Sequence, residues 1–121
     1  MASRNKLVGG WGEELALRYL KKKGYKPVSA GYRTRFEEID LIVKDRNYIV
    51  FTEVKLRRDD RFAQAREFVN TAKQRRLRLT AELWLQANET PLQPRFDVIE
   101  IYAPDGEKTA APVINHIENA F

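Results

Sequence analysis

Hydrophobic residues recur along this chain with two different periods. From residue 9 to residue 24, GGWGEELALRYLKKKG, the apolar positions have helical spacing, acidic residues fill the first turn, lysines fill the last, and Gly24 follows. This order suits the helix dipole and the capping preferences, so it predicts a helix. Residues 64–87 predict a second, longer helix. Its predicted apolar stripe comprises Phe68, Val69, Ala72, Leu79, Leu83 and Ala87.

Shorter segments rich in β-branched and apolar residues predict strands between and after these helices, over residues 26–35, 37–44, 48–56 and 95–102. The order is therefore α-β-β-β-α-β. The first three strands would form a meander, and a strand that follows a helix usually joins its sheet as a parallel neighbour. With no repeat, low-complexity tract or linker, the chain is predicted to be one α/β domain over residues 1–121, with a central mixed β-sheet flanked by helices.

The second and third strands predict a specific pairing. The sequence Asp45-Arg46-Asn47 is a turn signal, and a turn centred between Arg46 and Asn47 places Asp40 opposite Glu53. Directly paired residues project from the same face, so Glu38 and Lys55 join them. The other face is almost wholly apolar and must be buried, which specifies the register. Its predicted members are Ile39, Leu41, Val43, Val50, Thr52 and Val54.

Two acids opposite each other repel unless a positive charge compensates them. A divalent cation such as Mg²⁺ or Mn²⁺ is one candidate, since hard cations prefer carboxylate and carbonyl oxygens, and the main-chain carbonyl of Val54 could add a ligand. Ordinary ion pairs are the alternative. In that case Lys55 would pair directly with Glu38 and diagonally with Asp40.

Glu13 stands out in the first predicted helix because it lies on the apolar stripe with Ala16, Leu17 and Leu20. An unpaired buried charge is costly, so a carboxylate facing the core needs an explanation. It could stabilise the N-terminal end of the helix dipole. Alternatively, Glu13 could reach the same cation as Asp40 and Glu53.

The net charge of +5 and the pI of about 9.6 favour a polyanionic partner. Basic residues follow the third strand and crowd the second helix, where they could form a phosphate-binding rim or simply a solvated face. The candidates for nucleic-acid contact are Arg33, Arg35, Arg57, Arg58, Lys73 and Arg76. The chain lacks cysteine, a signal-type apolar segment and a membrane-length apolar run, so we expect a cytoplasmic protein with no membrane partner.

Three other polar or aromatic positions have simpler interpretations. Asp97, in the last predicted strand, is expected to pair with a neighbouring arginine. His116 is expected to pack within the tail, and a single histidine excludes a multi-histidine metal site. Trp11 and Trp84 are expected in or beside the core, with base stacking as the lesser alternative.

Several motifs together resemble the YraN-type family of bacterial proteins. They are GWGEELALRYLKKKGY, EEIDLIV, VFTEVKLRR, the stretch around Lys73 and Leu77, RFDVIEI and HIENAF, in this order over nearly the whole chain. That family is similar to archaeal Holliday junction resolvases and belongs with the PD-(D/E)XK nucleases. Two positions depart from its pattern: Glu37 stands where glycine is usual, and Gly31 where asparagine is frequent.

The resemblance implies a restriction-endonuclease-like αβββαβ core and a function as a metal-dependent endonuclease acting on branched or otherwise structured DNA. Asp40 would be the motif aspartate, Glu53 and Lys55 the E-x-K pair, Glu13 the first-helix glutamate, and Lys73 a phosphate contact. Asp40, Glu53 and Glu13 would hold Mg²⁺ or Mn²⁺, and a homodimer would suit a four-way junction. A nucleic-acid-binding protein without cleavage and a purely structural or protein-binding domain remain alternatives, because fold does not establish function.

Overall fold

The computed structural model describes residues 10–58 and 69–121, and the order of its elements confirms the predicted αβββαβ core. Helix α2 spans Trp11–Lys22 and helix α3 spans Thr71–Ala87. Strand β1 spans Lys26–Arg33, β2 spans Glu38–Lys44 and β3 spans Tyr48–Arg57. After α3, strand β4 spans Gln93–Tyr102, the short 3-10 helix η2 spans Gly106–Lys108 and strand β5 spans Val113–Ile117. Strand β5 was not predicted.

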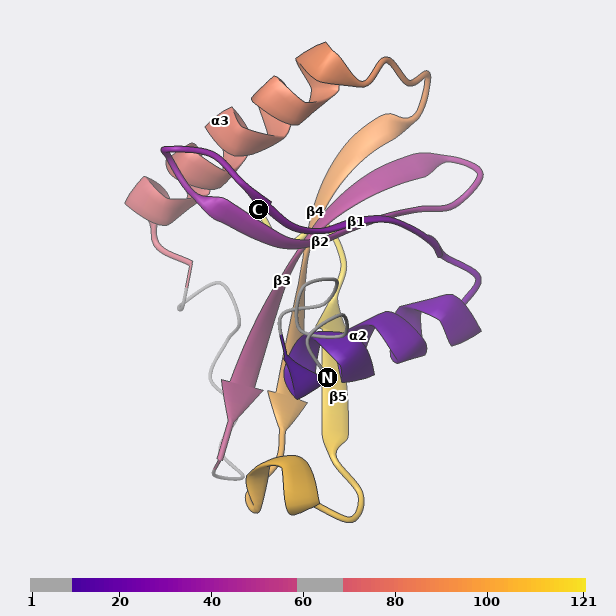
Figure 1. Ribbon diagram of the computed structural model, residues 1–121, viewed down its shortest axis with the longest axis vertical. Helices are drawn as coiled ribbons and strands as arrows, with labels where there is room; N and C mark the ends of the chain where they lie inside the picture. The colour runs from indigo at the N-terminus through magenta and orange to yellow at the C-terminus, as the bar shows by residue number, and fades with distance from the viewer. Residues whose placement is uncertain (1–9, 59–68) are drawn as a thin grey trace.

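The five strands form one mixed sheet in the order β1-β2-β3-β4-β5 (Figure 1). Strands β1, β2 and β3 are antiparallel, β4 is parallel to β3, and β5 is antiparallel to β4. The predicted parallel entry of the strand after the long helix is therefore confirmed. The predicted β2–β3 register is confirmed as well, since Ile42 pairs with Phe51 and Val43 with Val50.

Both faces of the sheet are buried, with α2 over one face and α3 over the other (Figure 1). Leu41, Val43 and Val50 pack with α2, as the predicted apolar face requires. Ile39 was predicted to share that face, but it packs in the α3-side cluster with Ile42 instead. Thus Leu41 is buried on the α2 side of the sheet and Ile39 on the α3 side, and Asp40 lies between these two residues.

The core-facing side of α3 differs from the predicted stripe. The buried residues of this helix are Leu77, Thr80, Ala81 and Trp84, which recur at helical spacing. Leu79 and Leu83 are instead 41% and 39% exposed, and Ala72 and Ala87 are exposed too. The burial of Trp84 confirms its predicted place in the core; Phe68 lies outside the described residues.

The start of α3 is also later than the predicted residue 64. Its N-cap is Asn70, whose Oδ1 accepts a hydrogen bond of 2.9 Å from the backbone N–H of Lys73. Asparagine is a favoured N-cap because its side chain satisfies one of the free N–H groups in the first turn. Residues 64–68 of the predicted helix lie outside the described residues. In the described parts of the chain, neither helix has the length and apolar character needed to cross a membrane.

Gly31 explains one departure from the family pattern. Its φ of +65° is a left-handed conformation in which glycine is unstrained and asparagine is the most tolerated alternative. Glycine therefore fits this place in β1 with less strain than asparagine would. A Cβ built at Gly31 would also lie 3.3 Å from Oε2 of Glu38, so a larger side chain would crowd that carboxylate.

Candidate functional site

The candidate site lies where β2 and β3 separate. Their ladder runs from the turn as far as the pair Leu41–Thr52 and does not continue to Asp40 and Glu53. Beyond this point β2 stays paired with β1, β3 stays paired with β4, and the two strands diverge (Figure 1). At the separation, Oδ2 of Asp40 accepts a hydrogen bond of 2.8 Å from the backbone N–H of Val54. The fork therefore directs a β2 carboxylate toward β3.

Asp40 and Glu53 are brought together at this fork, as the predicted register requires. Burial and the neighbouring charge of Glu53 raise the pKa of Asp40 from 3.8 to about 7, although the Val54 N–H acts in the opposite direction. Hydrogen bonding to Glu53 raises this pKa further. Two carboxyl groups placed in this way favour a shared proton or a cation between them.

Two lysines compensate Glu53, which is itself buried. Nζ of Lys73, in the first turn of α3, lies 2.6 Å from Oε2 of Glu53. Nζ of Lys55, on β3, lies 3.6 Å from the same oxygen. The alternative in which Lys55 pairs with Glu38 is not observed, because Glu38 pairs with Arg33 at 2.9 Å. Lys73, for which a phosphate contact is predicted, makes an ion pair with a site carboxylate in this structure.

Glu13 approaches the same site from α2, on the other side of the sheet. It is half-buried, and burial raises its pKa, as do the nearby charges of Glu38 and Glu53. The chain turns into α2 at Gly10, where a Cβ would lie 3.3 Å from Oε1 of Glu13. Glu13 thus adds to the negative potential at the fork.

The chemistry of these groups fits a hard divalent cation held by two carboxylates. Within residues 10–58 and 69–121, no group of three or more acidic or histidine side chains is arranged to hold a metal ion. The three predicted ligands Asp40, Glu53 and Glu13 thus do not form a ready-made three-carboxylate site. Mg²⁺, however, commonly binds proteins through one or two carboxylates and takes its other ligands from water and substrate phosphates. Asp40 and Glu53 meet that requirement.

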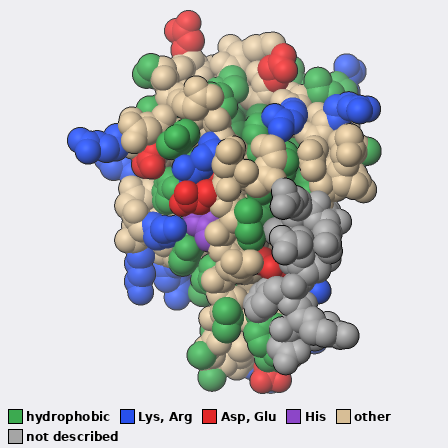
Figure 2. Space-filling model, turned by 180° about the vertical axis from the view of Figure 1, so that it is seen from behind, with side chains coloured by type: hydrophobic (Ala, Val, Ile, Leu, Met, Phe, Trp, Pro, Cys, Tyr) green, Lys and Arg blue, Asp and Glu red, His purple; other side chains and the backbone are tan. Residues whose placement is uncertain are grey.

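The six residues predicted to contact nucleic acid are placed unevenly. Arg33, Arg57 and Arg76 each pair with a carboxylate of the protein, namely Glu38 at 2.9 Å, Glu100 at 3.5 Å and Glu37 at 3.0 Å. Arg35 and Arg58 are exposed, and Arg35 lies over the ring of Phe36 at 4.9 Å. The face shown in Figure 2 carries Lys and Arg side chains in several separate places, interspersed with Asp and Glu side chains and with hydrophobic and uncharged surface.

The pairing of Arg76 explains the second departure from the family pattern. Glu37 stands in the turn between β1 and β2, and its Oε1 accepts a hydrogen bond of 3.0 Å from Nε of Arg76 on α3. Next to it, the hydroxyls of Thr34 and Thr80 lie 2.9 Å apart and join the turn to the helix. Glu37 therefore fastens the turn to α3, next to the lysine that contacts Glu53.

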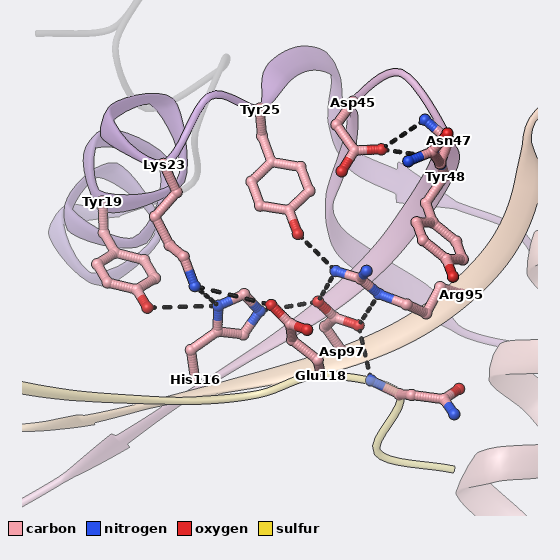
Figure 3. A network of polar contacts seen from close by, with 11 residues as sticks. Tyr19, Lys23, Tyr25, Asp45, Asn47, Tyr48, Arg95, Asp97, His116 and Glu118 are labelled. Atoms are coloured by element: carbon pink, nitrogen blue, oxygen red, sulfur yellow. Dashed lines mark hydrogen bonds and ion pairs between the residues drawn. The ribbon is translucent and has the colours of Figure 1, made fainter.

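A second polar cluster lies on the α2 side of the sheet (Figure 3). Asp97 on β4 is fully buried, and its carboxylate accepts hydrogen bonds of 2.9 and 2.8 Å from Arg95 and one of 3.0 Å from the N–H of Asn119. Nε2 of His116 lies 2.8 Å from the same carboxylate. Although burial acts to raise the pKa of Asp97, these hydrogen bonds lower it overall.

This cluster confirms the expected arginine partner of Asp97. His116 was expected to pack within the tail, but it contacts Asp97 and so joins β5 to β4. Arg95 joins β4 to the segment after α2, because it also donates to the hydroxyl of Tyr25 at 2.6 Å. Sequence analysis missed the cluster as a unit. The available signal was the pair of charged residues Arg95 and Asp97, which share one face of an otherwise apolar strand.

Glu100 is a further buried acid that sequence analysis missed. Its side chain on β4 is fully buried, Arg57 lies at 3.5 Å, and Nδ2 of Asn115 on β5 donates to it at 3.4 Å. Glu100 is the direct neighbour of Lys55 in the parallel β3–β4 ladder. A charged residue within the segment VIEIY was the only sign of it in the sequence.

Comparison with known proteins agrees with this architecture. Residues 12–101 match the model of the family described as "Uncharacterised protein family UPF0102". A UPF0102 protein of Syntrophomonas wolfei is 43% identical over 97% of this chain and 99% of its own length. Relatives from Caldanaerobacter subterraneus and Thermodesulfovibrio yellowstonii are 42% and 43% identical, over 96% and 94% of this chain and 95% of their own lengths. The YraN-type resemblance is confirmed: this chain belongs to the UPF0102 family.

Proposed function

We propose that this protein is a divalent-metal-dependent nuclease that hydrolyses phosphodiester bonds in structured or branched DNA. The observation that carries the proposal is the fork between β2 and β3, which brings Asp40 and Glu53 together and sets Lys55 beside Glu53. Two acids can hold a divalent ion that assists phosphodiester hydrolysis, and an amine beside them can stabilise charge on the phosphate. The αβββαβ core and the family membership are consistent with it.

Asp40 and Glu53 would hold Mg²⁺ or Mn²⁺, and Glu13 would add negative potential from α2. Such an ion, when bound, neutralises charge on the scissile phosphate and makes water more acidic. Lys55 would stabilise the charge that develops on the phosphate in the transition state. Lys55 Nζ lies 3.6 Å from Oε2 of Glu53, so its ammonium group is already beside the site before substrate arrives.

The substrate would be recognised by its backbone and shape. Arg35 and Arg58 are exposed, and Lys73 and Arg76 flank the site from α3. Phosphate contacts position a nucleic acid but do not read its sequence. We therefore propose specificity for branching rather than for a base sequence, in a homodimer that would place one site on each of two strands of a four-way junction. The proposed place of action is the cytoplasm.

The experiment compares linear, flapped and four-way DNA, with Mn²⁺ and without it, for wild type and Asp40→Asn. Asparagine can still accept the hydrogen bond from Val54 N–H, so this variant keeps the local structure. We expect Mn²⁺-dependent cleavage, strongest on the four-way substrate, in wild type only. Unchanged cleavage by Asp40→Asn would refute the proposed site.

A nucleic-acid-binding protein without cleavage is the second candidate, favoured by the ion pairs that Glu53 already makes with two lysines. It predicts salt-sensitive DNA binding that is equal in wild type and Asp40→Asn, with no cleavage in the presence or absence of Mn²⁺. The same experiment, read by both binding and product formation, separates the two candidates.

A further inference from the structure

The contact between Lys73 and Glu53 has a consequence for metal binding. Nζ of Lys73 lies 2.6 Å from Oε2 of Glu53, one of the closest ion pairs in the described residues. Lys73 is 21% and Glu53 7% exposed at the side chain, so this contact is only partly screened by solvent. The backbone of Lys73 is fixed by the Asn70 cap, whereas its ammonium group is at the end of a flexible four-carbon stem.

We propose that Lys73 occupies the cation position of this site in the metal-free protein and is displaced from Glu53 when a divalent ion binds. The released ammonium group then becomes available to a phosphate of the nucleic acid. This inference rests on the proposed function, because it assumes that Asp40 and Glu53 are the metal-binding carboxylates. It gives Lys73 two alternating partners rather than a single phosphate contact.

Competition follows from the geometry around one oxygen atom. Mg²⁺ binds carboxylate oxygens at about 2.0–2.1 Å, and Lys73 Nζ lies 2.6 Å from Oε2 of Glu53, so an ion on that oxygen would lie within about 4.7 Å of the ammonium nitrogen. Two positive charges at such a separation repel strongly in a partly buried site. Lys55 Nζ, at 3.6 Å from Oε2, is not in direct contact with that oxygen, so a bound ion competes with Lys73 first. Lys73 is therefore the cation that moves.

The exchange also explains how the site can exist without metal. In the absence of an ion, Asp40 and Glu53 repel each other, and the contact with Lys73 offsets part of that repulsion. An uncompensated buried charge would destabilise the fold. Because coupling between two ligands is reciprocal, metal that frees Lys73 should strengthen nucleic-acid binding, and nucleic acid should strengthen metal binding.

The test is a calorimetric titration with Mn²⁺, without nucleic acid, of wild type, Lys73→Met, Arg75→Met and Asp40→Asn. Methionine keeps the length of lysine without its charge. Arg75→Met is the matched control, since it removes one positive charge from an exposed position of the same helix. We expect Lys73→Met to lower the Kd for Mn²⁺ about tenfold and Arg75→Met to change it by less than about twofold.

The outcomes separate this inference from the proposed function. If Mn²⁺ binds wild type but not Asp40→Asn, and Lys73→Met binds it no more tightly than Arg75→Met, Lys73 is not the displaced cation and the proposed function stands. If Asp40→Asn binds Mn²⁺ as wild type does, the proposed metal site is wrong and this inference with it. Lys73→Gln, which keeps a hydrogen-bond donor for Glu53, serves as the second uncharged variant if Lys73→Met does not fold.

Discussion

The backbone N–H of Val54 donates a hydrogen bond of 2.8 Å to Oδ2 of Asp40 across the fork between β2 and β3. A side chain of β2 thus satisfies a backbone group of β3 beyond the last residue pair of their ladder. Asp40 is thereby held next to Glu53 by the protein itself, without a metal ion. A site placed in this way on rigid strands needs little rearrangement when an ion binds.

Asp40→Asn is expected to stabilise the metal-free protein at neutral pH by about 1–2 kcal/mol. The substitution removes the repulsion with Glu53 and can keep the hydrogen bond from Val54 N–H. Since the pKa of Asp40 rises from 3.8 to about 7 on folding, wild type loses stability as the pH rises between these values. The gain should therefore be absent below about pH 4 and complete above about pH 7.

Urea unfolding of both proteins in EDTA, over this range of pH, measures that gain. Lower stability of Asp40→Asn at pH 8 would show that no repulsion exists at the fork. A gain that does not change with pH would show that the repulsion does not come from ionisation of this carboxyl group. Glu82→Gln, at an exposed position of α3, controls for the loss of one negative charge.

Lys55→Met should lower the cleavage rate about 10²–10³-fold while the affinity for DNA changes little. Lys55 lies next to Glu53 and would contact only the reacting phosphate, so its contribution should appear in the transition state. Single-turnover cleavage with Mn²⁺ and a separate binding assay measure the two effects. A parallel loss of affinity and rate would make Lys55 a general phosphate contact instead.

Asp97→Asn should destabilise the protein by about 3 kcal/mol without changing Mn²⁺ binding. It would leave Arg95, whose side chain is only 9% exposed, without its charged partner. The pKa of Asp97 is lowered on folding from its ordinary 3.8, so its contribution is present above that pH and is lost as the pH falls through the lower folded value.

Acid unfolding followed by circular dichroism tests this: the stability difference between wild type and Asp97→Asn should be constant near neutral pH and should shrink below about pH 4. A loss of less than about 1 kcal/mol at neutral pH would mean that the cluster does not hold β5 in place.

Glu37→Gln should strengthen DNA binding and steepen its dependence on salt. The substitution frees Arg76 from an internal ion pair and removes a negative charge beside the site. Each additional phosphate contact adds about 0.9 to the slope of log K against log salt concentration. Fluorescence anisotropy at several NaCl concentrations measures the slope. An unchanged slope, or one equal to that of Glu82→Gln, would place Arg76 outside the interface.

The β2–β3 register could be predicted because it follows from local alternation. A slip by one residue would turn the apolar residues that pack against α2 to the other face of one strand, so few arrangements were possible. The side of α3 that faces the sheet could not be predicted in the same way. The helix has apolar residues on two sides, one with Leu77, Ala81 and Trp84 and the other with Leu79 and Leu83. Which side is buried depends on how the helix packs against the sheet, and the helix sequence alone does not specify that packing.

Contacts between segments that are distant in the sequence also could not be predicted. Strand β5 is short and includes Asn115 and His116, and it exists as a strand because β4 is there to pair with it. The contact of Lys73 with Glu53 joins residues from a helix and a strand, and no spacing rule relates them. Sequence identified the acids and the amine of the candidate site, but not which of its cations contact which carboxylate.

The central claim is that Asp40 and Glu53 share one divalent ion. Crystals of the protein soaked in Mn²⁺, with diffraction recorded at the manganese absorption edge, test it most directly. The predicted result is an anomalous peak between the carboxylates of Asp40 and Glu53 in wild type, which is lost in Asp40→Asn. A map with no peak at the fork in well-occupied soaks, or with the ion bound by other residues, would contradict the account.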